Sequence, residues 1–527
     1  MNKQELVKLF ALATVAAPVV LLGASIALAK EISGPLTGSV PKAICGPGDH
    51  TESGLQGQTT PQERSSGDSQ RAYNCNLELV GQDQGEGNYS QDGPAYYGTC
   101  AYFGTDRVTN LQQHPGMTVI DASDPTHPVT TAYLNDSAAA LQPHETPKVH
   151  AQRGLLAVGQ TTGSNFAVYD VSTDCRHPAL KGSVSLPSTS GHHQGNFAPD
   201  GMTYYLTQNF QGIGGFVYIV DLTDPSNPIE LPRWQYLGNG RPHEVWFNAD
   251  GTRMYVGQAG LFGGNLGIVG PDGLVIEDVS DYQFRRPNPQ IRIISTLFWD
   301  DQGAAEPMYP FRSKGRQYVV SSDETGGNLG VGGAPAACAR GASPHGYPNI
   351  IDVTDDTNPK IVAKLRLEVS DPANCAVMLN DPPEVGGGIP AYNEERCVTD
   401  RPNNPTMLAC AFQFAGLRVF DIRDLSHPKE IAYWKPGGVR KQFLPGSLLW
   451  NPTADRTMDR VAGYPRFFTR VPGKGNANGV GNGNGNGNGN GTQLEIWIVG
   501  ADNGFQILRF TDNFKAQHQD LFEDAGD

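Results

Sequence analysis

Short apolar runs that end in an aspartate recur along the chain, and each is followed by a polar turn containing proline. The first run is MTVIDASDPTHPV at residues 117–129. Later copies are FAVYDVSTDCRHPAL (166–180), VYIVDLTDPSNPIEL (217–231), LVIEDVSDYQFRRPNPQI (274–291), NIIDVTDDTNPKIV (349–362) and LRVFDIRDLSHPKEI (417–431). Apolar runs of this length, bounded by Asp, Ser and Pro, predict β-strands joined by turns.

The aspartate at the end of each run is expected to be structural. Its carboxylate can accept backbone N–H groups of the following turn, while proline fixes φ there. A seventh copy, FQILRFTDNF (505–514), is degenerate and has Phe510 in place of the aspartate. The six aspartates are Asp121, Asp170, Asp221, Asp278, Asp352 and Asp421.

A second β-rich run precedes every copy, for example LLAVGQ, RMYVGQ and LEIWIVG. Four short strands per unit, with a period of about fifty residues, predict an all-β fold, a single β-propeller. Seven units can be delimited, so seven four-stranded blades are expected, with six or eight as alternatives. They span approximately residues 76–134, 141–187, 188–237, 238–297, 298–369, 385–434 and 441–514. An N-terminal segment is expected to supply a strand to the last blade, because otherwise both end blades expose an edge.

These VIDxSDPxxP units resemble the LVIVD-repeat family of secreted bacterial β-propeller proteins. The resemblance covers most of residues 76–514, and NCNLELVGQ (74–82) resembles the opening of that family's first blade. It implies a propeller and a surface or periplasmic location, and it implies no substrate. The chain departs from the pattern in its insertions near 370–400 and in its seventh copy.

The regions outside the repeats have distinct compositions. Lys3 and Lys8 precede an apolar run that ends in Ala27-Leu28-Ala29, which predicts a signal peptide over residues 1–29, with an uncleaved anchor as the alternative. Residues 30–75 form an irregular lead, residues 476–492 a flexible Asn/Gly loop within the propeller (76–514), and residues 515–527 a C-terminal tail. No other stretch is long and apolar enough to span a membrane.

Charge and cysteine content narrow the function classes. The net charge is −15 and no Lys/Arg cluster appears, so nucleic acid is excluded as a partner. The expected partner is a small molecule or a component of the cell envelope. Eight cysteines after an export signal predict disulfides and a periplasmic or secreted location. Cys45–Cys75 and Cys375–Cys397 are plausible pairs because short loops close most easily. The chain contains no CxxC spacing, so a zinc site built from cysteines is not expected.

Histidines recur in register on the strand that opens successive units. HHQGNFAPDG and HEVWFNADG place His193 and His243 seven residues before Asp200 and Asp250. His144 lies close to the same place in the second unit. Because the first strand of each blade lines the central channel, these side chains are expected to converge at one end of it. Further candidate metal ligands are His192, His150 and His345.

Converging imidazoles suit Zn, Cu or Fe, and the acidic candidates Glu145, Glu244 and Glu306 can support them, bind the metal or act in catalysis. Adjacent strand residues point to opposite faces, so a His-Glu dipeptide can present both side chains to one metal only where the strand has not yet begun. The alternative is that each histidine simply hydrogen-bonds a loop carbonyl. His127, His177 and His427 lie in the Asp–Pro turns and are expected to be structural.

Three function classes follow. The first is a propeller that binds a ligand or partner, with a possible metal site. The second is a metal-dependent enzyme, most plausibly an oxidoreductase, acting at the channel mouth. The third is a hydrolase or lyase that uses carboxylates such as Asp300, Asp301 and Glu306 with a divalent ion, Ca²⁺ included, although a solvated acidic loop explains these residues as well.

Overall fold

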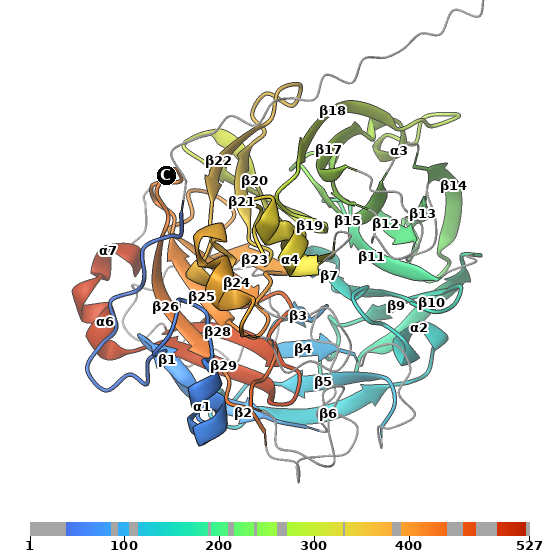
Figure 1. Ribbon diagram of the computed structural model, residues 1–527. Coiled ribbons are helices and arrows are strands. Elements are labelled where there is room, and N and C mark those ends of the chain that lie inside the picture. Colours follow the sequence, from blue (N-terminus) through green and yellow to red (C-terminus); the bar gives the residue numbers. More distant parts are fainter. Residues whose placement is uncertain are drawn as a thin grey trace, which may run out of the picture.

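The computed structural model describes residues 38–85, 93–104, 114–187, 191–208, 215–236, 240–260, 271–329, 333–381, 392–439, 457–470 and 493–522. The expected signal peptide and the Asn/Gly loop lie outside these residues. Within them the chain forms seven antiparallel sheets around a common centre, a seven-bladed β-propeller (Figure 1). The predicted fold class and blade number are confirmed.

The blades follow the chain, and in each one the first strand is innermost, apart from the two N-terminal strands described below. Neighbouring inner strands contact one another around the channel. The first three blades are β3 (Ala95–Tyr97), β4 (Cys100–Phe103), β5 (Met117–Asp121) and β6 (Val129–Leu134); β7 (Lys148–His150), β8 (Leu155–Gly159), β9 (Asn165–Asp170) and β10 (Ala179–Ser185); and β11 (His192–Phe197), β12 (Thr203–Gln208), β13 (Phe216–Asp221) and β14 (Ile229–Gln235).

The next two blades are β15 (Arg241–Phe247), β16 (Arg253–Ala259), β17 (Asp272–Asp278) and β18 (Arg292–Trp299); and β19 (Ala305–Ser313), β20 (Arg316–Asp323), β21 (Asn349–Asp352) and β22 (Lys360–Lys364). The sixth blade holds β23 (Arg396–Thr399), β24 (Met407–Phe412), β25 (Gly416–Asp421) and β26 (Lys429–Lys435), and the seventh holds β27 (Arg466–Arg470), β28 (Gln493–Gly500) and β29 (Gly504–Phe510).

Two N-terminal strands complete the last two blades. β1 (Tyr73–Cys75) is a fifth, outermost strand on the sixth blade, and β2 (Leu77–Asp83) pairs with β29 as the outer strand of the seventh. The ring therefore closes through an N-terminal strand, as expected. Residues 74–82, compared above with the opening of a first blade, instead finish the sixth and seventh blades.

In every blade the fourth strand from the centre carries one extra residue relative to the third. At β10 and β2 this bulge lies against the next blade's turn. A Cβ added at Gly182 on β10 would lie 2.7 Å from the Pro225 carbonyl oxygen in the following blade. The same contact closes the ring, because a Cβ at Gly81 on β2 would lie 2.1 Å from the Pro125 carbonyl oxygen in the first blade.

The aspartates that end the third strands form the predicted turns. In each turn the carboxylate accepts the backbone N–H two residues later, for example Ser123 to Asp121 at 2.8 Å. The other five pairs are Ser172–Asp170, Thr223–Asp221, Ser280–Asp278, Thr354–Asp352 and Arg423–Asp421. The turn histidines His127, His177 and His427 are exposed and contact the aspartate three residues before them.

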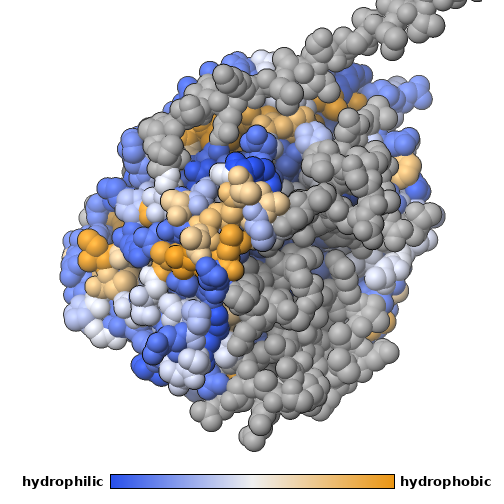
Figure 2. Space-filling model, in the orientation of Figure 1, coloured by the Kyte–Doolittle hydropathy of each residue, from blue (hydrophilic) through white to orange (hydrophobic). Residues whose placement is uncertain are grey.

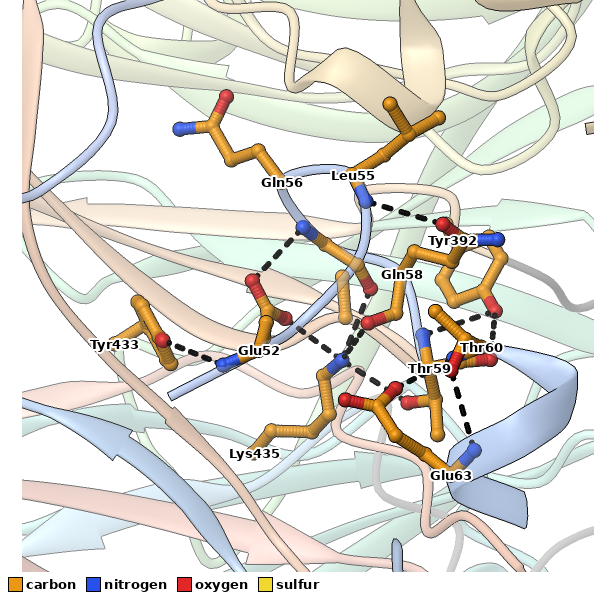
Figure 3. Close-up of polar contacts among 12 residues, drawn as sticks. Glu52, Leu55, Gln56, Gln58, Thr59, Thr60, Glu63, Tyr392, Tyr433 and Lys435 are labelled. Carbon is orange, nitrogen blue, oxygen red and sulfur yellow. Dashed lines mark hydrogen bonds and ion pairs between the residues drawn. The ribbon is translucent and has the colours of Figure 1, made fainter. Parts of the chain in front are cut away.

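The N-terminal lead packs on the sixth blade through a buried ion network. Lys435 Nζ contacts Glu52 Oε1 at 2.7 Å and donates to the Gly57 and Gln58 carbonyls at 3.1 and 2.9 Å (Figure 3). Arg418 pairs with both Glu52 and Glu430. Although burial opposes ionisation, Arg418 and Lys435 lower the pKa of Glu52 to about 2. The lead is therefore part of the folded body.

Short helices and 3-10 turns occupy the lead, the insertions and the C-terminal region. They are α1 (Pro61–Ser66), η1 (Asp68–Gln70), α2 (Ala138–Leu141), η2 (Ala151–Arg153), α3 (Ser280–Gln283), η3 (Gly326–Leu329), α4 (Gly333–Ala339), η4 (Glu368–Ser370), η5 (Pro372–Asn374), α5 (Cys375–Met378), α6 (Asp512–Gln517) and α7 (Gln519–Phe522). Among the described residues, no helix is long and apolar enough to cross a membrane.

All eight cysteines form disulfides. Cys45–Cys75 ties the lead to β1, as expected, and Cys100–Cys175 joins the first two blades. The predicted pair Cys375–Cys397 is wrong. Cys375 instead joins Cys338, linking two insertion helices, and Cys397 joins Cys410 directly across the pairing of β23 with β24. For Cys397, the cross-strand position of Cys410 determined the disulfide.

In the coloured part of Figure 2, hydrophilic residues surround groups of hydrophobic ones, the most extensive of which lies near the centre of the view. Exposed hydrophobic residues include Val129, Leu180, Ile229 and Ile293 at the starts of outer strands. The buried apolar residues form clusters between adjacent blades, such as the one that Phe166 and Tyr204 share across the second and third.

Candidate functional site

Bulges on three consecutive inner strands shape the channel. In β11, β15 and β19, two residues oppose a single residue of the neighbouring strand: His193-Gln194, His243-Glu244 and Glu306-Pro307. A bulge re-aims side chains that a regular strand would send to opposite faces. The residues that the sequence placed in register thus lie at one irregularity repeated in three blades.

His243 is fixed by its neighbours. Its Nδ1 lies 3.1 Å from the Ala305 carbonyl oxygen, and its Nε2 lies 3.4 Å from Glu306 Oε1. Burial lowers the pKa of His243 to about 3, so the ring is neutral at physiological pH. A carbonyl that accepts the Nδ1 proton leaves Nε2 as the lone-pair nitrogen that can bind a metal.

His144 and Glu145 reach the channel from the loop before β7. His144 has φ +41°, an uncommon conformation for a residue other than glycine. Its Nε2 lies 3.0 Å from Glu145 Oε1, and both side chains are buried. This dipeptide meets the condition set out from the sequence, because the strand begins only at Lys148.

His193 lies between the other two histidines. Its ring stacks on that of His243 with centroids 4.5 Å apart, and the His144 ring is 5.8 Å away. Its Nε2 is 3.5 Å from Glu145 Oε2. Burial would raise the pKa of Glu145, yet His193, His144 and Arg396 together hold it well below its usual range, so this carboxylate is ionised.

Two overlapping groups of potential ligand atoms result. His144, Glu145 and His193 form one, and Glu145, His243 and Glu306 form the other; within each group the atoms lie within 4.8 Å of one another. Glu145 belongs to both groups. Five residues from four consecutive blades thus meet at one place in the channel.

Arg396, at the start of β23, completes this cluster from the sixth blade. Its guanidinium contacts Glu306, lies 3.2 Å from Glu145 Oε2 and 3.8 Å from Glu244 Oε2, and is buried. Sequence reasoning missed it. The sixth unit carries no histidine at this place, and only alignment of its inner strand with the others could have drawn attention to an arginine there.

Glu244 faces a neighbouring set of side chains. Tyr464 OH donates to its Oε1 at 2.7 Å, Trp246 Nε1 at 3.1 Å, and Lys148 Nζ lies 3.3 Å from the same oxygen. Glu244 and His243 therefore both face the channel, because of the bulge, but they contact different groups. Lys148 and Tyr464 were also missed from the sequence.

The remaining candidate histidines lie in other surroundings. His192 is buried edge-on to Tyr218, with ring centroids 5.0 Å apart, and burial lowers its pKa to about 4. His150 bonds the Pro199 carbonyl oxygen at 2.9 Å and caps η2. His345 packs edge-on to Tyr392. None of the three belongs to the ligand groups found among the described residues.

Other acidic candidates have structural partners. Asp301 pairs with Lys364 at 3.0 Å and with Arg366 at 2.8 Å. Two further groups combine one carboxylate with two cysteines: Cys45/Asp49/Cys75 and Glu394/Cys397/Cys410. In both groups the two cysteines form a disulfide with each other. Thiolate is the form that binds metal, so these two groups are set aside.

Comparisons with known proteins agree with this architecture. Residues 112–135 match the LVIVD repeat family, so the protein is a β-propeller that carries an LVIVD repeat. No curated protein sequence matches the chain.

Solved structures resemble the chain at low identity and with TM-scores below 0.5. Hydrazine synthase from Kuenenia stuttgartiensis is 12% identical with a TM-score of 0.45, over 82% of this chain and 96% of that one. A hypothetical selenium-binding protein from Sulfolobus tokodaii is also 12% identical with a TM-score of 0.45, over 80% and 93%. The periplasmic gluconolactonase of Pseudomonas aeruginosa is 10% identical with a TM-score of 0.40, over 82% and 94%.

Proposed function

We propose that this protein is a metal-binding β-propeller that holds one divalent transition-metal ion in its channel. The ligands would come from His144, His193, His243, Glu145 and Glu306. The observation that carries the proposal is the convergence of two ligand groups on the shared carboxylate of Glu145. Ligands about 2.1 Å from one ion are at most about 4.2 Å apart, so a small inward movement of these side chains would suffice.

The donor set favours some ions over others. Neutral imidazoles suit Zn, Cu and Fe, whereas Ca²⁺ prefers an all-oxygen shell. Three of the five donors are histidines, and the Ala305 carbonyl orients His243 as outer-shell groups orient metal-binding rings. We therefore favour Zn, Cu or Fe over Ca²⁺.

The location proposed for the protein is the periplasm or the outside of the cell. Four disulfides among the described residues fit an oxidising compartment. The expected export signal points the same way.

Two functions share this metal site. A binding protein needs the ion only as an anchor for a ligand, whereas an oxidoreductase needs a redox-active ion. Copper or iron would favour the enzyme, and zinc would favour the binding function. Metal identity therefore decides between them. The hydrolase or lyase built on Asp301 is less favoured, because Lys364 and Arg366 already hold that carboxylate.

Metal analysis of the purified mature protein tests the proposal. We expect about one ion per chain by inductively coupled plasma mass spectrometry, and its loss in a His193→Ala, His243→Ala double variant, because both substitutions remove imidazole donors. The matched control is His127→Ala, His177→Ala, which removes two exposed turn histidines. A metal-free wild-type protein, or an unchanged metal content in the folded first variant, would contradict the proposal.

A further inference from the structure

The charges around the proposed metal do not balance once an ion is present. Three carboxylates, Glu145, Glu244 and Glu306, meet one guanidinium, Arg396, and one ammonium, Lys148. Histidines bind a metal in their neutral form, so in the loaded site these five side chains contribute −1 and a divalent ion brings the sum to +1. All five side chains are buried, where uncompensated charge is expensive.

Arg396 is the group most affected by an ion. Two of its three acidic partners, Glu145 and Glu306, are the carboxylates assigned to the metal. An ion that draws these oxygens toward itself leaves Glu244 as the carboxylate facing Arg396, beside the Glu395 carbonyl that its guanidinium already binds at 2.8 Å. Glu244 is already shared with Lys148 and accepts hydrogen bonds from Tyr464 and Trp246. Metal binding therefore weakens two of the three ion pairs described for this buried guanidinium.

We propose that the metal-loaded channel binds a small monoanion that bridges the ion and Arg396; this inference rests on the proposed metal site. One monoanion restores neutrality in the group of charges described above. A carboxylate-type anion matches the donors, because guanidinium binds carboxylates through two parallel N–H···O bonds while leaving oxygen lone pairs for the ion. The ligand class is thus a small carboxylate or an anion of similar size.

The site also implies an order of binding. Before the ion enters, Glu145 and Glu306 occupy the guanidinium of Arg396 and repel an anion. After the ion enters, it binds these two carboxylates, so the guanidinium becomes accessible and the carboxylates no longer repel an anion. Metal and anion therefore bind with positive coupling, and each must raise the affinity of the other by the same factor.

Cobalt(II) supplies a spectroscopic probe and azide a small monoanion. Azide titrated into the cobalt-loaded full-length protein should change the visible absorption of the ion, and formate should compete with it. In Arg396→Met, azide affinity should fall about tenfold or more because a charged hydrogen-bond partner is lost. The same variant should bind cobalt more tightly, since its carboxylates are no longer held by the arginine.

Opposite changes in the two affinities distinguish this role from general damage to the site. Arg460→Met is the matched control, because Arg460 pairs with Glu395 instead. Should Arg396→Met fail to fold, wild-type protein suffices: cobalt affinity should rise with azide present. Cobalt bound without any response to azide, or equal azide affinity in Arg396→Met, would overturn the inference and leave the metal site standing. Failure of cobalt to bind would overturn both.

Discussion

His243 combines the two roles that its sequence context suggested as alternatives. Its Nδ1 meets a backbone carbonyl, as a structural histidine would, while its Nε2 faces Glu306 and the shared ligand groups. The carbonyl contact fixes the ring in the orientation and tautomer that a metal requires. A structural hydrogen bond and a ligand role are therefore compatible in one side chain.

The sequence identified the histidines better than their partners. His144, His193 and His243 could be found because they recur in register, and the structure brings them together with Glu145 and Glu306. Arg396 and Tyr464 come from the sixth and seventh units, where insertions disrupt that register. Residues that meet only across the channel leave no local pattern in the chain.

Glu52 provides a residue-scale prediction of acid stability. Arg418 and Lys435 lower its folded pKa from 4.5 to about 2, so its stabilisation is complete above pH 4.5 and is lost as pH falls through 2. Wild type should exceed Glu52→Gln in free energy of unfolding by roughly 3 kcal/mol at neutral pH, and the gap should narrow between those pH values. Chemical denaturation at a series of pH values measures it.

The control for this prediction is Glu78→Gln, which changes an exposed glutamate on β2. Burial and the neighbouring Glu52 raise the pKa of Glu430. Glu430 therefore makes the protein less stable as the pH rises, whereas Glu52 makes it more stable. For that reason the quantity to follow with pH is the difference in free energy of unfolding between wild type and Glu52→Gln. A gap that stays constant from neutral pH to pH 2 would contradict the assignment.

At the scale of elements, the inner-strand bulges decide what the channel contains. Strand alternation correctly predicts strands, but it cannot reveal one extra residue, since an inserted residue leaves the apolar pattern on either side intact. It therefore could not show that His243 and Glu244 both face the channel. The outer-strand bulges were hidden from the sequence for the same reason.

Gly257, opposite the bulge in β15, tests this arrangement. A Cβ there would lie 1.6 Å from the Glu306 carbonyl oxygen, so Gly257→Ala must displace the inner strand of the next blade. We expect a loss of about 1–3 kcal/mol in stability and at least about tenfold weaker metal binding. Calorimetric titration with the metal measures the second effect.

Gly215→Ala is the control for space, because its Cβ would have no neighbour nearer than 3.7 Å. If Gly257→Ala bound the metal as tightly as wild type, the position of the Glu306 carboxylate would not depend on the close approach of Gly257 to the Glu306 backbone.

At the scale of the whole molecule, closure depends on the N-terminal strand. The repeat predicted the blades and the need for a closing strand, but the sequence suggested that residues 74–82 open the first blade. Their true place follows from long-range pairing with Phe510 and its neighbours, which no local pattern records.

Gly81→Ala should weaken the closure specifically. Its Cβ would lie 2.1 Å from the Pro125 carbonyl oxygen, forcing the seventh blade away from the first. We expect a lower melting temperature and a loss of about 1–3 kcal/mol, together with faster hydrogen exchange in β2 and β29. Exchange followed by mass spectrometry localises the effect; protection lost equally in all blades would argue against it.

Because β2 pairs with β29, it must wait for its partner until nearly the whole chain has been synthesised. At about 5–20 residues per second, β29 leaves the ribosome roughly 20 to 90 seconds after β2, its partner. Throughout that interval β2 has an unsatisfied edge, the feature that invites pairing with other chains. A cell that makes this protein must therefore keep β2 from pairing with other chains until β29 has been synthesised.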